Sequence, residues 1–117
     1  MTGNSERPKN TQTKVSAFVD HDTAIIAELR NDPHYAEIYL QAAFEEIYEP
    51  GGVSAFLIAL RQVIESRGGV SVIAEKAGIS RQHLYRALSE NGNPTIGTLT
   101  AVTRAAGVRM SSSAQRG

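Results

Sequence analysis

The fold is decided by the stretch Ser71-Val-Ile-Ala-Glu-Lys-Ala-Gly-Ile-Ser-Arg-Gln-His-Leu-Tyr-Arg-Ala-Leu-Ser89, which contains two short helical patterns joined by a Gly-Ile-Ser turn. Gly78 can supply the positive φ of a tight turn, because glycine has no Cβ. Ala74 allows the two helices to approach closely, and Ile79 fills the angle between them. Ser80 is suited to cap the second helix. This spacing predicts a helix-turn-helix.

The second of these predicted helices has one apolar and one polar side. At about 100° per residue, Leu84, Ala87 and Leu88 share one side, and the opposite side carries hydrogen-bond donors. Arginine can bind guanine O6 and N7, glutamine can bind adenine N6 and N7, and tyrosine can contact phosphate or a thymine methyl group. We therefore predict that DNA is bound by Ser71, Ser80, Arg81, Gln82, His83, Tyr85 and Arg86. The alternative is an ordinary helical hairpin whose polar face is basic.

The segments on either side of this stretch predict further core helices. Downstream, residues 91–94 form a turn, Thr95 caps a helix, and Gly107 ends that helix. Upstream, a helix is predicted over residues 53–67, ending at Gly68-Gly69. Its apolar stripe consists of Val53, Phe56, Leu57, Leu60, Val63 and Ile64. Ile58 falls on the far side of this helix, where we expect the N-terminal helices to dock.

Two helices are predicted ahead of residue 50. The first runs from about residue 23 to 30 with Asp22 as its N-cap, and the second from Pro33 to about Tyr48 after the cap Asp32. The apolar arc of the second helix covers more than half of its circumference, whereas one core face needs little more than about 100°. This helix therefore lies between two neighbours or offers part of its surface to another chain.

The charge of the chain is segregated although its formal net charge is zero. Residues 20–50 contain eight acidic residues against one arginine, a net charge of −7, and residues 51–117 contain eight basic residues against three acidic ones, a net charge of +5. The chain thus has an acidic front and a basic back. Solubilising charge on exposed helices would explain the acidic segment equally well.

Length and composition exclude several classes of protein. A chain of 117 residues fits one small domain with tails. The absence of cysteine excludes disulfides, thiolate metal sites and cysteine nucleophiles. The longest apolar run, residues 55–60, is too short to span a bilayer, and the first 20 residues lack a signal-peptide core. We expect a soluble cytoplasmic protein.

An enzyme would need a catalytic or metal-binding set, for which His21, Asp22 and His34 are the candidates. They fall at a loop and a helix start, lack the i, i+4 histidine pair of a helical metal site, and have no glycine-rich phosphate loop nearby. We therefore expect no enzymatic activity, no metal and no cofactor.

The run from Ile79 to Thr95, followed by Leu99 and residues 107–110, resembles the HigA-like addiction-module antidotes, which carry a lambda-repressor-like helix-turn-helix of the Xre or Cro/CI type. Upstream, residues 38–40, 42–45 and 55–60 also resemble that family's paired helices. The resemblance implies an all-α protein: a five- to six-helix lambda-repressor-like domain preceded by two acidic helices. It also implies a homodimeric autorepressor that binds operator DNA and neutralises a RelE/HigB-like mRNA-cleaving toxin. The alternative is a stand-alone or phage-type repressor without a toxin.

These expectations divide the chain into four parts. Residues 1–19 form a disordered tail, 20–50 an acidic partner-binding segment, 51–110 the DNA-binding domain and 111–117 a flexible tail. An acidic surface suits a toxin whose own site must be basic enough to hold RNA. We expect toxin contacts from the apolar residues of the N-terminal third: Val15, Phe18, Val19, Tyr35, Ile38 and Tyr39.

Overall fold

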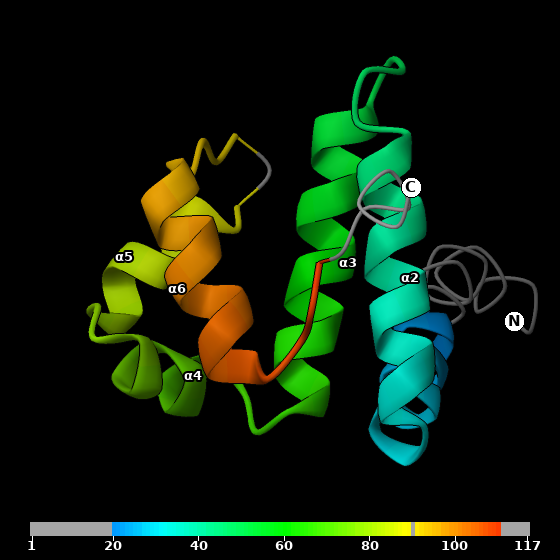
Figure 1. Cartoon of the computed structure of the whole chain (residues 1–117), viewed down its shortest axis with the longest axis horizontal. Coiled ribbons are helices and arrows are strands. Elements are labelled where there is room, and N and C mark those ends of the chain that lie inside the picture. Colours follow the sequence, from blue (N-terminus) through cyan, green and yellow to red (C-terminus); the bar gives the residue numbers. More distant parts are fainter. Residues whose placement is uncertain (1–19, 90, 111–117) are drawn as a thin grey trace, which may run out of the picture.

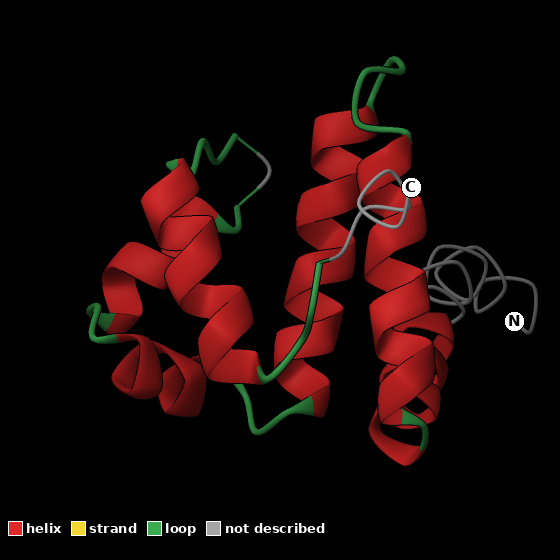
Figure 2. Ribbon diagram, viewed as in Figure 1, coloured by secondary structure: helices red, strands yellow, loops and turns green. Residues whose placement is uncertain are grey.

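The computed structural model describes residues 20–89 and 91–110. Residues 20–31 are helical. The helices that follow are α2 (Pro33–Glu45), α3 (Gly52–Ser66), α4 (Val70–Ala77), α5 (Arg81–Ala87) and α6 (Ile96–Ala106). The described ranges contain no strand, and Figure 2 shows the helices connected by short loops, so the all-α prediction is confirmed.

The expectations for both tails, including toxin contacts from Val15, Phe18 and Val19, lie outside the described residues.

Helix α3 stands in the middle of the molecule, with α2 and the helix of residues 20–31 on one side and α4, α5 and α6 on the other (Figure 1). One hydrophobic core joins both sides. Leu29 and Leu40 enter it from the N-terminal helices, and Ile73, Leu84 and Val102 enter it from α4, α5 and α6. The acidic segment therefore packs on the same core as the predicted DNA-binding helices.

The start of α2 forms as predicted, but its end comes earlier. The side chain of Asp32 accepts a hydrogen bond from the Tyr35 N–H at 3.1 Å, and Pro33 occupies the first turn. Helix α2 ends at Glu45 rather than near Tyr48. Beyond it the chain tightens into i to i+3 turns. The α-helix cannot continue through Pro50, because the proline has no N–H and its ring would clash with the carbonyl of residue 46.

The prediction that Asp22 caps the first helix is wrong, because residues 20–31 are helical and Asp22 lies inside this helix. Its carboxylate accepts hydrogen bonds from Arg61 Nη2 at 3.1 Å and Gln62 Nε2 at 2.7 Å. Gln62 in turn accepts a 2.6 Å hydrogen bond from the Tyr39 hydroxyl. A polar network of four side chains therefore joins the two acidic helices to α3.

The predicted roles of Val53 and Ile58 are also wrong. Val53 is 52% exposed, because it lies in the first turn of α3, and so it is not part of the core. Ile58 is 49% exposed and lines a hollow with Tyr85 and Leu88 of the following helices. The N-terminal helices dock instead along the side of α3 that carries Phe56 and Gln62.

Arg67, the C-cap residue of α3, ties the two sides of the molecule together. Its Nη1 donates to the carbonyl of Ala106 at 3.0 Å, and its Nη2 donates to the carbonyl of Pro33 at 3.2 Å. One guanidinium group thus binds both the end of α6 and the start of α2. Its positive charge also interacts favourably with the negative C-terminal end of the α6 dipole.

Candidate functional site

The turn between α4 and α5 has the geometry that the sequence predicts. Gly78 adopts φ 76° in the left-handed region, and a Cβ there would meet no atom within 4 Å, so its glycine requirement comes from the backbone alone. The Ile79 N–H donates to the Ala74 carbonyl at 3.0 Å and closes α4. The Ser80 side chain accepts a hydrogen bond from the His83 N–H at 3.0 Å and opens α5. Both ends of the turn are therefore fixed.

Helix α5 divides into a buried and an exposed side as predicted. Leu84 is 1% exposed, and Ala87 and Leu88 are each 8% exposed. All of the side chains predicted to bind DNA are exposed, namely Ser71, Ser80, Arg81, Gln82, His83, Tyr85 and Arg86. Arg81 Nη1 lies 3.4 Å from Ser71 Oγ, so the exposed faces of α4 and α5 meet at this point.

Two arginines of the basic half are engaged inside the fold. Arg61 pairs with Asp22, and Arg67 binds backbone carbonyls. The net charge of the C-terminal half therefore overstates the charge available to a nucleic acid. Lys76, Arg81 and Arg86 are exposed on α4 and α5, which form one outer flank of the molecule (Figure 1).

Tyr85 occupies a border position on α5. It is 54% exposed, and it also lines the hollow that contains Ile58 and Arg61 of α3. Tyr85 is therefore exposed at the border between the outer face of α5 and the hollow beside α3.

The residues of α2 predicted to contact a toxin do not share one surface. Tyr35 and Tyr39 pack partly buried against the core, with ring centroids 5.9 Å apart. Burial raises the pKa of Tyr39, and the nearby Tyr35 and Asp22 raise it further. Ile38 is 52% exposed and lines a hollow with Gln41 and Glu45. Only Ile38 of these three is freely available on the outer side of α2.

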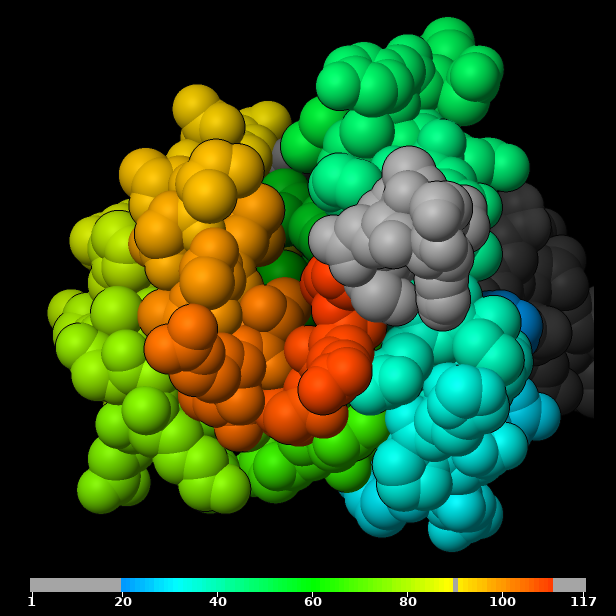
Figure 3. Space-filling model, in the orientation of Figure 1, coloured from blue at the N-terminus to red at the C-terminus, as the bar shows by residue number. Residues whose placement is uncertain are grey.

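Sequence reasoning missed a furrow of about 580 Å³ between α2 and α6. In Figure 3, α6 (orange) and α2 (cyan to green) stand apart on the surface, and α3 is visible deep between them. Phe44 and Phe56 lie in it with ring centroids 5.8 Å apart. The exposed apolar surplus of α2 was the available signal, but periodicity could not show that α6 forms the opposite wall.

Two of the three candidate enzymatic residues, Asp22 and His34, have separate partners. Asp22 is bound by Arg61 and Gln62, whereas the exposed His34 lies 4.0 Å from Glu37. In the described part of the chain, no three His, Asp or Glu side chains come together in a way that could hold a metal ion.

Comparison with known families and proteins identifies a family and a relative of this chain. Residues 14–114 match the family described as probable addiction module antidote protein. The chain belongs to this family. It is also 40% identical over 70 residues to an uncharacterized protein of Haemophilus influenzae, an alignment that covers 60% of this chain and 71% of the relative. No solved structure matches the chain.

Membership of the addiction-module antidote family makes this chain an antitoxin, and the family implies a toxin partner. Within residues 20–89 and 91–110, no helix combines the length and apolarity needed to cross a membrane.

Proposed function

We propose that this chain is the antitoxin of a type II toxin-antitoxin module, a HigA-like, Xre-type autorepressor that binds operator DNA as a homodimer and neutralises a RelE/HigB-like mRNA-cleaving toxin. The observation that carries the proposal is the α4–α5 unit, a fixed turn that presents arginine and glutamine side chains outward, in a chain of the antidote family. Both partners act in the cytoplasm, which we propose as its location.

The geometry of α5 supports sequence-specific DNA binding. The cap at Ser80 fixes the first turn, so Arg81 and Gln82 project from a defined position rather than from a mobile loop. Burial of Leu84 at 1% exposure holds the opposite side of the helix in the core. One short helix covers too few base pairs for useful specificity, so a twofold dimer on an inverted repeat is proposed.

We further propose that the chain acts by binding alone, without enzymatic activity, metal or cofactor. One of the three candidate catalytic residues, Asp22, is engaged in the fold, since it accepts hydrogen bonds from two residues of α3. The proposed function needs recognition alone. Helix α5 supplies donors for bases, and the acidic, partly apolar α2 supplies a surface for a basic protein.

Replacement of Gln82 by alanine tests the DNA-binding part of the proposal. Gln82→Ala is expected to weaken binding to the cognate operator by about 1 to 3 kcal/mol and to weaken binding to random DNA much less, because a lost base contact removes specificity. Binding is measured by fluorescence anisotropy at fixed salt, with operator DNA taken from the promoter of the chain's own gene. Equal losses on both DNAs would show that Gln82 does not contact bases.

Capture of the protein encoded beside this gene tests the toxin-binding part. The purified product of the adjacent reading frame should bind the chain, and co-expression should restore growth. If it does neither while the operator is still bound, the chain is a stand-alone repressor.

A further inference from the structure

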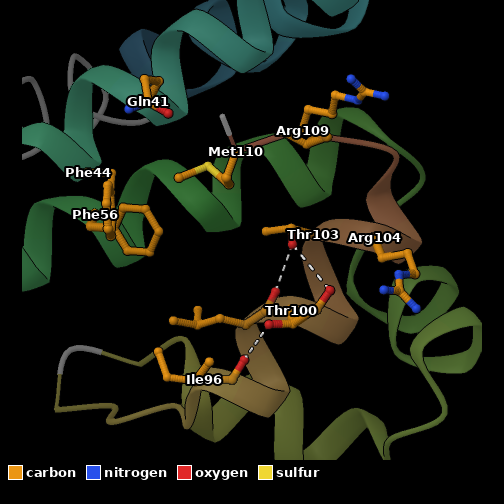
Figure 4. A pocket seen from close by; sticks show the side chains of 11 residues that line it. Gln41, Phe44, Phe56, Ile96, Thr100, Thr103, Arg104, Arg109 and Met110 are labelled. Carbon is orange, nitrogen blue, oxygen red and sulfur yellow. Dashed lines mark hydrogen bonds between the residues drawn. The ribbon is translucent and has the colours of Figure 1, made fainter. Parts of the chain in front are cut away.

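The furrow between α2 and α6 is apolar along most of its length. Phe44 and Phe56 form one end, and apolar residues of α6 and of the segment after it form the opposite wall (Figure 4). These residues are Ile96, Leu99, Val108 and Met110. A furrow of about 580 Å³ with this lining has the size of a site that takes several side chains of a partner.

The threonines of the furrow add to its apolar character. Thr100 Oγ1 donates to the Ile96 carbonyl at 2.8 Å, and Thr103 Oγ1 lies 2.9 Å from the Leu99 carbonyl. Because each hydroxyl proton is directed to the helix's own backbone, these side chains present mainly their methyl groups to a partner. Figure 4 shows both hydrogen bonds running along α6.

Large apolar side chains are left uncovered at the furrow. Ile96 is 77% exposed and Phe44 is 45% exposed. A more polar hollow that contains Ile38 adjoins the furrow along α2, because Gln41 and Arg109 line both. Large apolar side chains that are gathered in one furrow and left exposed can serve as anchors for a partner.

The charges around this surface define the partner. Glu37 and Glu45 line the hollow on α2 together with Arg109, and the Arg109 N–H donates to Glu37 Oε2 at 3.2 Å. Glu45 is exposed, and the segment of residues 20–50 has a net charge of −7. Arg104 and Arg109 lie at the end of the furrow remote from the two phenylalanines (Figure 4). A fitting partner is therefore basic opposite Glu45 of α2, apolar in the middle and acidic opposite Arg104 of α6.

We propose that the toxin docks here, inserting apolar side chains between α2 and α6. This inference rests on the proposed toxin pairing, and it adds α6 to a site that sequence reasoning placed on residues 15–48 alone. A second copy of the chain fits the surface less well, since a twofold contact would bring two acidic α2 helices together. The seven residues after Met110 contain a single alanine as their apolar residue, which does not complement the furrow.

Site-directed photo-crosslinking tests the location, because the chain contains no cysteine and a single introduced one is unique. Ile96→Cys is labelled with benzophenone maleimide, and Ile58→Cys serves as the matched control, since Ile58 is 49% exposed on another face. The probe partner is the purified product of the adjacent reading frame. The label at position 96 should crosslink to that protein at least about tenfold more efficiently than the label at position 58.

Affinity gives a second measurement that needs no label. Ile96→Gln should weaken binding of the same protein at least about tenfold, as expected for an apolar anchor, whereas Ile58→Gln should leave it unchanged. Both isoleucines are exposed, so neither change disturbs the core. Circular dichroism of both variants checks this.

Two sets of results would overturn the inference. If the adjacent protein binds the wild-type chain but position 96 crosslinks only to a second copy or to residues 111–117, the furrow has another occupant and the proposed function stands. If Ile96→Gln binds that protein as tightly as the wild type, the toxin does not dock on Ile96, and this inference fails while the proposed function stands. If the wild-type chain does not bind it at all, the toxin-pairing proposal and this inference fail together.

Discussion

The α4–α5 flank and the α2–α6 furrow present opposite chemistries on one small molecule. The flank carries exposed donors such as Arg81 and Gln82 on a short helix that is capped by Ser80. The furrow carries exposed apolar residues such as Phe44 and Ile96, with carboxylates beside it. The first surface suits a polar, negatively charged ligand and the second suits a basic protein with an apolar element.

This difference indicates that two partners can be bound by separate surfaces, while both surfaces depend on one core. Leu40 of α2 and Leu84 of α5 belong to the same hydrophobic cluster. Exposed substitutions should therefore affect one surface at a time, and core substitutions should affect both.

The largest loss of stability is expected from a core substitution, which should weaken both surfaces at once. Leu40 is fully buried, and Leu40→Ala should lower the free energy of unfolding by about 2 to 5 kcal/mol through lost burial and a cavity. Binding of the operator and of the adjacent protein should decline together. Binding assays test this, and urea denaturation measures the loss of stability. Ile38→Ala on the same helix, at a position 52% exposed, is the control and should leave stability within about 0.5 kcal/mol. Loss of one activity alone in Leu40→Ala would contradict the shared core.

The next effect concerns the one guanidinium group that joins α2 to α6. Arg67→Ala removes two charge-assisted hydrogen bonds and should lower the free energy of unfolding by about 2 kcal/mol. Arg104→Ala, on the exposed last turn of α6, should lower it by less than about 1 kcal/mol. Thermal and urea unfolding measure both. Similar values for the two variants would mean that Arg67 does not connect the two sides.

A smaller effect sharpens the comparison at the turn of the flank. Gly78→Ala places a Cβ on a residue with φ 76° and should destabilise the protein by about 1 to 2 kcal/mol. Gly97→Ala, within α6, should have the opposite effect and raise the free energy of unfolding by about 0.5 to 1 kcal/mol, because the helical backbone at this position accommodates alanine. Opposite shifts of the urea midpoint are expected. Shifts of the same sign would contradict the assigned turn.

The smallest effect belongs to the polar network beneath the acidic helices. Tyr39→Phe leaves Gln62 Oε1 without its 2.6 Å partner and should lower the free energy of unfolding at pH 7 by about 1 kcal/mol. The raised pKa of Tyr39 adds a pH dependence, since the unfolded chain loses its proton first and native stability falls above about pH 10. The difference in the free energy of unfolding between wild type and Tyr39→Phe should therefore become smaller at alkaline pH.

The control for this pH dependence is Tyr48→Phe, at a side chain that is 97% exposed. Urea unfolding of the three proteins at pH 7 and at pH 10.5 supplies the comparison. If the difference in the free energy of unfolding between wild type and Tyr39→Phe is the same at both pH values, ionisation of Tyr39 has no role in stability.

Local signals in the sequence predicted the α4–α5 flank well. The glycine at position 78, the cap at Ser80 and the buried side of α5 appear in the structure as expected. The N-terminal helices were predicted in kind, but Asp22 proved to be a hydrogen-bond partner of α3 rather than a cap. A carboxylate near a helix start fits both roles, and only the approach of α3 distinguishes between them.

The sequence by itself determined where α2, α5 and α6 begin and where α6 ends, because the caps Asp32, Ser80 and Thr95 and the glycine at position 107 act on the residues beside them. It also determined which side of α5 is apolar, since the helical period fixes that within one element. Tertiary structure alone decided which face of α3 receives the N-terminal helices, that Tyr35 and Tyr39 turn inward while Ile38 stays exposed, and that α2 and α6 enclose an apolar furrow. These features depend on contacts between residues far apart in the chain, which arise only when the helices pack on a common core.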